Sequence, residues 1–120
     1  MNTTRRWIAG ACLALLAIAA HAHAFLERAD PRVGSQVQAV PAEVKLWFNE
    51  PLEIAFSTLM VLDASGRRVD RADAHLDADN KALVRVSLPP LAPGAYTVRW
   101  RAVSVDTHVT QGEFVFRVGP

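Results

Sequence analysis

The sequence contains almost no cysteine. Cys12 is the only one among 120 residues, and it lies in an apolar run near the N-terminus. Because an intrachain bridge needs two cysteines, a disulfide framework is excluded. If this run is removed from the mature protein, thiolate metal sites and thiolate catalysis are excluded as well. A domain of this length must then be held together by its hydrophobic core.

The sequence also lacks an excess of charge of either sign. It carries 13 Lys and Arg residues against 12 Asp and Glu residues, a formal net charge of +1. This balance gives no bulk electrostatic reason to expect nucleic acid or an anionic membrane surface as a partner. Internal repeats and low-complexity segments are absent as well. A chain of 120 residues suits a single domain.

The start of the chain has the pattern of a secretory signal peptide. Arg5 and Arg6 form a positive n-region, residues 7–20 form an apolar h-region, and Ala20-His21-Ala22 is a small-x-small cleavage site. The apolar run is shorter than the ~20 residues that span a bilayer, which argues against a membrane anchor. We therefore expect cleavage after this motif and a periplasmic location.

This pattern divides the chain into a signal peptide, residues 1–22, and one domain, residues 23–120. The arginine pair partly resembles a twin-arginine export signal, but the usual Phe-Leu pair does not follow it. Ordinary secretion is favoured, and the export route stays open. Cys12 lacks the preceding leucine of a lipid-attachment site, so we do not expect a lipid anchor there.

The rest of the chain alternates apolar and polar residues with a period of two, which is typical of half-buried strands. Turn-forming Gly, Pro, Asp and Asn residues separate the alternating stretches, and no helical period lasts three turns. The pattern predicts an all-β fold, a seven-stranded Greek-key β-sandwich of immunoglobulin-like size. The expected core residues are Leu46, Phe48, Val61, Val84, Val86, Tyr96, Val98, Trp100, Phe114 and Phe116.

Cleavage after residue 22 would make His23 the N-terminal residue. An N-terminal histidine offers two nitrogens to one metal, its α-amine and its ring Nδ1. Asp106 and His108 follow the expected strand 94–103 and lie two residues apart. On extended backbone, residues two apart share a face, so a carboxylate oxygen and an imidazole nitrogen would project together.

Together these groups supply three nitrogens and one oxygen, a set that suits tetragonal Cu(II) and lacks the soft sulfur that Cu(I) favours. On its own, an Asp-x-His pair is more often a surface hydrogen-bond pair than a metal site. Its combination with an N-terminal histidine in a secreted domain without cysteine favours the metal interpretation.

The sequence resembles the CopC copper-resistance family of secreted β-sandwiches through nearly the whole domain. The similar stretches are His23-Ala24-Phe25-Leu26, Pro31 with Gly34, Leu46 to Glu50, Gly94 to His108, and Gly112 to Val118. The longest of them matches the family pattern Gly-x-Tyr-x-Val-x-Trp-Arg-x-x-Ser-x-Asp-x-His. The resemblance implies a CopC-like barrel and one Cu(II) ion per chain, held by His23, Asp106 and His108.

The resemblance also implies secondary roles. Glu50 matches a family glutamate near the copper, so we expect it to contact a ligand or to bind weakly along the axis; the alternative is a solvated charge. Ser104 either supports the Asp106 loop or shapes the turn.

Some members of the family bind Cu(I) through a Met-rich loop. Here Met60 is the only methionine after the signal peptide, and we expect it to lie in the core. We therefore expect no Cu(I) site. His75 stands alone and is expected at the surface.

The expected function is that of a monomeric copper carrier or buffer in copper homeostasis and resistance, not of an enzyme. The resemblance suggests a CopD-like inner-membrane protein as the partner that receives copper. The alternative is an oxidative copper enzyme with a histidine brace. Asp106 in an equatorial position disfavours it, because oxygen activation needs an open coordination position. A metal-free adhesion or assembly domain is the third class.

Overall fold

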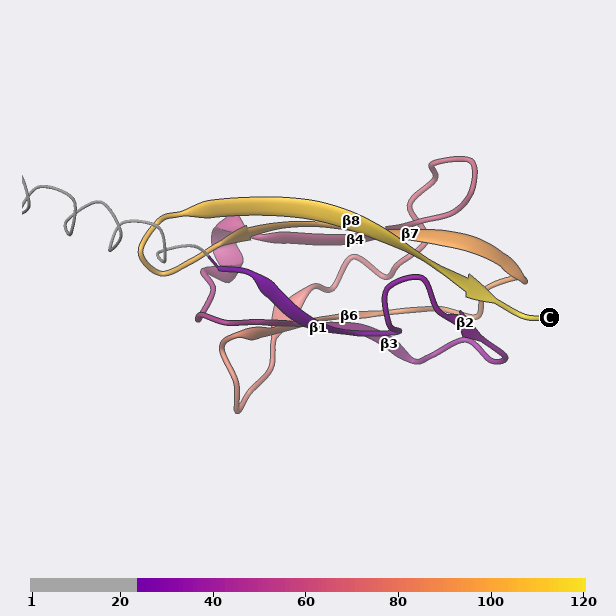
Figure 1. Ribbon diagram of the computed structural model, residues 1–120, viewed down its shortest axis with the longest axis horizontal. Helices are drawn as coiled ribbons and strands as arrows, with labels where there is room; N and C mark the ends of the chain where they lie inside the picture. Colours follow the sequence, from indigo (N-terminus) through magenta and orange to yellow (C-terminus); the bar gives the residue numbers. More distant parts are fainter. Residues whose placement is uncertain (1–23) are drawn as a thin grey trace, which may run out of the picture.

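The structure is a computed structural model that describes residues 24–120. The predicted signal peptide and His23 lie outside the described residues. Within the described part the chain forms eight strands and one turn of 3-10 helix (Figure 1). Their bounds are β1 Leu26–Asp30, β2 Gln36–Val37, β3 Glu43–Phe48, η3 Ile54–Phe56, β4 Thr58–Leu62, β5 His75–Leu76, β6 Leu83–Ser87, β7 Gly94–Val103 and β8 Val109–Val118.

The strands form two sheets of four, in the orders β1-β3-β6-β5 and β2-β8-β7-β4. The sheets lie one over the other as a sandwich (Figure 1), which confirms the predicted fold class. All pairs are antiparallel except β2 with β8, which pair in parallel over two residues. In residues 24–120, no helix is long and apolar enough to cross a membrane.

The core lies between the sheets and follows the predicted alternation. Nine of the ten expected core residues are buried, and Trp100 is half-buried against the same cluster. The ring of Trp100 packs edge-on to Phe48 and tilted against Phe114, with centroids 6.3 and 6.4 Å apart. The aromatic pairs therefore join β3 of one sheet to β7 and β8 of the other.

The described chain has eight strands where seven were predicted, and three of the eight, β1, β2 and β5, show no clear alternation. The register of β1 against β3 shifts between Leu26 and Arg28, which interrupts the period of two. β2 and β5 each have two residues, too few to show a period. All three lie at sheet edges, where only one neighbour constrains the pattern.

One methionine differs from its predicted environment. Met60 is not in the core: it is half-buried on the outer face of β4, in a hollow that Arg99 and Arg101 also line. The prediction failed because Met60 lies between two buried residues, Leu59 and Val61, and its own side chain points the other way.

Gly112 allows the close approach of Trp100, its partner in the β7–β8 register. A Cβ at Gly112 would lie 2.5 Å from the indole ring. We expect Gly112→Ala to lower the free energy of unfolding by about 1–3 kcal/mol, because overpacking forces the ring or the strand to move. Urea unfolding followed by tryptophan fluorescence measures this loss. A variant as stable as the parent would show that the ring does not need the space.

Candidate metal centre

Three segments far apart in the sequence meet at one end of the sandwich. They are the start of the described chain, the link from β3 to η3, and the turn between β7 and β8 (Figure 1). Asn49 donates its backbone N–H to the carbonyl of Phe25, at 3.1 Å. Val105 donates its backbone N–H to the carbonyl of Pro51, at 3.2 Å. The link from β3 therefore contacts both of the other segments.

The turn between β7 and β8 is closed by its own backbone. We call residues 104–108 the 104–108 turn. Ser104 donates its N–H to the carbonyl of His108 at 3.0 Å, and Thr107 donates to the carbonyl of Ser104 at 2.9 Å. Thr107 has a φ of 72°, in the left-handed region that non-glycine residues rarely adopt. The turn is thus tight, and its conformation is specific.

Asp106 and His108 face each other in this turn. The Nδ1 atom of His108 lies 3.1 Å from the Oδ2 atom of Asp106, and each side chain is 43% exposed. Metal–ligand bonds of this kind are about 2.0–2.2 Å long. Two donor atoms that bind one metal ion at right angles therefore lie about 2.8–3.1 Å from each other. The separation of these two atoms therefore fits neighbouring positions on one metal ion. The two side chains are partly exposed, whereas the Nδ1 atom of His108 that faces Asp106 is buried.

Ser104 fixes the other oxygen of the same carboxylate. Its hydroxyl donates to the Oδ1 atom of Asp106, and Ser104 is the fully buried residue at the base of the turn. This hydrogen bond, together with His108, holds the pKa of Asp106 below its ordinary value against a smaller opposing effect of burial. The carboxylate therefore stays ionised at neutral pH, as a metal ligand must.

The sequence-based reason for pairing Asp106 with His108 was wrong. We expected extended backbone, on which residues two apart share a face. The backbone turns at residues 105–106 instead, and Thr107 takes a positive φ. The two side chains come together because the turn folds them toward each other across Thr107. The geometry of the pair thus depends on the turn and not on the strand.

Glu50 lies between the two points at which the β3 link is attached. Its neighbour Asn49 bonds to Phe25, and its other neighbour Pro51 bonds to Val105. Glu50 itself is half-buried. The two chain neighbours of Glu50 therefore contact both halves of the expected site, whereas contact of Glu50 itself with a metal ligand stays a prediction.

Sequence reasoning missed the side chains that anchor the beginning of the described chain. The hydroxyl of Thr110 donates to the carbonyl of Ala24 at 2.7 Å, and the backbone N–H of Phe25 donates to the Oδ1 atom of Asn49 at 2.5 Å. Ala24 is completely buried. One signal was available: Thr110 follows His108 by two residues at the start of a strand. The partner carbonyl, 86 residues away, had no signal.

Other sequence features lie outside this end of the sandwich. His75 is exposed, as predicted, and its Nδ1 lies 2.8 Å from the carbonyl oxygen of Asp73. In the part of the chain that the structure describes, no group of three or more His, Cys, Asp or Glu side chains is arranged to hold a metal. The Asp106–His108 pair would therefore need donors from elsewhere, and the predicted source is His23.

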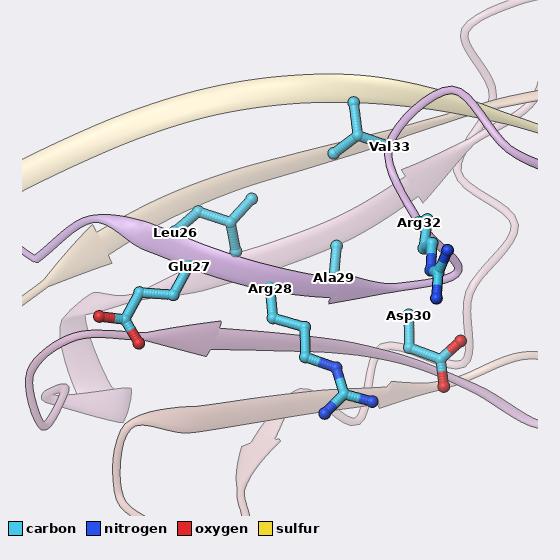
Figure 2. Close-up of a pocket in the computed structure, with 7 residues that line it drawn as sticks. All are labelled: Leu26, Glu27, Arg28, Ala29, Asp30, Arg32 and Val33. Carbon is cyan, nitrogen blue, oxygen red and sulfur yellow. The ribbon is translucent and has the colours of Figure 1, made fainter.

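A hollow of about 610 Å³ runs along β1. Figure 2 shows that Leu26 and Ala29 point from β1 toward β8, whereas Glu27 and Arg28 point away from it. The hollow contains neither member of the Asp106–His108 pair and no histidine. Its mixed charges, from Glu27, Arg28, Asp30 and Arg32, favour no single ligand, so the candidate centre remains the 104–108 turn.

This chain is similar to known proteins in both sequence and structure. Copper transport protein CutJ of Bacillus subtilis is 33% identical over a match that covers 99% of this chain and 22% of CutJ, so the chain spans under a quarter of that protein. Copper resistance protein C of Pseudomonas syringae pv. tomato is 34% identical, with 87% of this chain and 86% of that protein covered. The crystal structure of CopC from Methylosinus trichosporium OB3b superposes with a TM-score of 0.76 at 37% identity, over 82% of this chain and 95% of that one.

The match to a family model is equally extensive. The CopC domain model aligns with residues 26–119, which include every strand and the whole 104–108 turn. Sequence relatives, a solved structure and the family model thus agree over the same part of the molecule. This chain belongs to the CopC family.

Proposed function

We propose that the exported form of this chain, residues 23–120, binds one Cu(II) ion. The ligands would be the α-amine and ring nitrogen of His23, a carboxylate oxygen of Asp106 and a ring nitrogen of His108. The observation that carries the proposal is the Asp106–His108 pair, whose facing atoms are 3.1 Å apart. Ala24, which follows His23 in the sequence, is anchored by Thr110 next to this pair, and this supports the proposed ligand set.

The donor set decides which metal the site would take. Three nitrogens and one oxygen in a near-planar arrangement match the tetragonal preference of Cu(II), which also heads the divalent affinity order. The pair has no sulfur neighbour that would favour Cu(I). Met60, the only methionine in residues 24–120, lies on the outer face of β4 beside Arg99 and Arg101. We therefore propose a Cu(II) site without a Met-rich Cu(I) site.

The role we propose is that of a periplasmic copper carrier or buffer in copper resistance. The names of the relatives support it, since they are a copper resistance protein and a copper transport protein. Residues 1–22 would be the signal peptide that directs export. A CopD-like inner-membrane protein would exchange copper with the domain, which we expect to act as a monomer. Asp106 in an equatorial position would leave little room for oxygen activation, so we propose binding and not catalysis.

Proton competition provides the test of this function. A free α-amine has a pKa of about 7.7–8.0, so lowering the pH from 7 to 5 should weaken Cu(II) binding about 100-fold through the amine alone. Asp106 adds no loss until lower pH, because its pKa is lowered. Competition titration of the exported protein should give one Cu(II) per chain at pH 7 and this decline toward pH 5. No binding at pH 7, or an affinity that does not change with pH, would contradict the proposal.

A further inference from the structure

Two side chains outside the proposed ligand set hold the first described residues in place. We call Ala24 and Phe25 the N-terminal segment. Thr110 donates its hydroxyl hydrogen to the Ala24 carbonyl, at 2.7 Å. The side-chain Oδ1 atom of Asn49 accepts a hydrogen bond from the backbone N–H of Phe25, at 2.5 Å. The backbone N–H of Asn49 donates to the Phe25 carbonyl, at 3.1 Å. Three hydrogen bonds thus act on two consecutive residues.

The anchoring groups come from both sheets of the sandwich. Thr110 is in β8, and Asn49 directly follows β3 of the other sheet. The methyl group of Ala24 is buried in the core cluster between them. Because the segment is held from two sides and by its own side chain, it has one position relative to the Asp106–His108 pair. Chain ends without such contacts are usually poorly ordered.

We propose that Asn49 and Thr110 are positioning residues that present the N-terminal amine to the metal, an inference that rests on the proposed function. A terminal ligand on a mobile segment must lose its conformational freedom when the metal binds, which lowers affinity. The anchors remove that cost, because the segment is ordered before the metal arrives. Their effect acts on the affinity contributed by the amine and not on the Asp106–His108 pair.

The test combines an anchor variant with a displaced N-terminus. The full chain is exported from cells, with or without one glycine inserted between Ala22 and His23, and Cu(II) affinity is measured by competition. Thr110→Val removes the hydroxyl at nearly constant volume. In the form that begins at His23 it should weaken binding about 5–10-fold, the equivalent of one hydrogen bond. In the glycine-extended form, whose amine is displaced, it should change affinity less than about twofold.

Matched variants separate positioning from structure. Thr110→Ser keeps the hydroxyl and should restore affinity, and Thr97→Val makes the same chemical change in the middle of β7 and should have no effect. Asn49→Ala with Thr110→Val should weaken binding about 50-fold, since each anchor contributes separately. Electron paramagnetic resonance of this double variant should show a second Cu(II) species with fewer nitrogen ligands. Thermal unfolding of each metal-free variant confirms that it is folded.

The outcomes distinguish this inference from the proposed function. An equal loss in both N-terminal forms would show that Thr110 merely supports the 104–108 turn, and would overturn the inference. The inference would also be overturned if Thr110→Val caused no loss of affinity in either form while the glycine insertion itself weakened binding. If the glycine insertion has no effect on the parent protein, the proposed ligand set fails and the inference fails with it.

Discussion

Inserting one glycine between Ala22 and His23 should weaken Cu(II) binding by the exported protein at least ~1,000-fold. The insertion places the nitrogen of His23 in a peptide bond and moves the free amine one residue away. The two-nitrogen chelate of the terminal residue is then lost, together with the high effective concentration of its second donor. This loss should exceed the 10–100-fold that changes around a metal site usually cause.

The glycine insertion has a simple control. The exported proteins are weighed by mass spectrometry, so that the N-terminal residue of each is known before copper is added. Their metal-free forms should unfold at the same temperature, because the described fold begins at Ala24 and the insertion lies before it. Equal copper affinity for the two proteins would mean that the amine is not a ligand.

Replacing His108 with alanine should weaken Cu(II) binding by about 100–1,000-fold. The variant removes a nitrogen donor whose Nδ1 lies 3.1 Å from Asp106, and no other histidine lies nearby to replace it among residues 24–120. Asp106→Asn, which removes the negative charge at constant shape, should cause a similar loss because the amide oxygen is a much weaker ligand. Both side chains are partly exposed, so both metal-free variants should remain folded, which thermal unfolding checks.

His75→Ala is the matched control for His108→Ala. His75 is exposed on β5, in the sheet that does not contain the 104–108 turn, and it is the other histidine among residues 24–120. Its removal should leave the copper affinity unchanged. If His75→Ala lowers the affinity as much as His108→Ala does, the metal does not bind at the 104–108 turn.

Much of the fold follows from the alternation of the sequence. The strand expected over residues 94–103 is β7, with the same bounds, and the predicted core residues lie between the sheets. β8 begins at Val109, earlier than the apolar stretch around Phe114 suggested. Polar residues and Gly112 interrupt the pattern there, but pairing with β7 continues to Val109. Long-range pairing thus extends a strand beyond its local signal.

The edge strands were not predictable from local pattern. β1 has a shifted register next to Arg28, and β2 is defined by its parallel pairing with Arg117 and Val118 of β8. Both features depend on partners far away in the sequence. A period of two residues reports which face is buried, and it carries no information about which strand lies alongside.

The pairing of Asp106 with His108 was predictable from the sequence, but the geometry of the pair was not. Asp106 and His108 were identified from their types and spacing, and they do face each other, but across a turn in which Thr107 has a positive φ. Ser104, fully buried, binds the carboxylate of Asp106 with its hydroxyl and closes the turn with its backbone, so it fills both of the roles that the sequence left open. The anchors of the N-terminal segment had no local signal, since their partners are 24 and 86 residues away.

In the site that we propose, every nitrogen bound to the copper belongs to a histidine residue, with the terminal amine among them. Electron paramagnetic resonance of the Cu(II)-loaded exported protein tests this most directly when the histidines alone carry the heavy nitrogen isotope. All nitrogen couplings of the directly bound set should then change to those of the heavy isotope, and they should correspond to three nitrogens. Persistent coupling to an unlabelled ligand nitrogen, or coupling to fewer than three, would contradict the account.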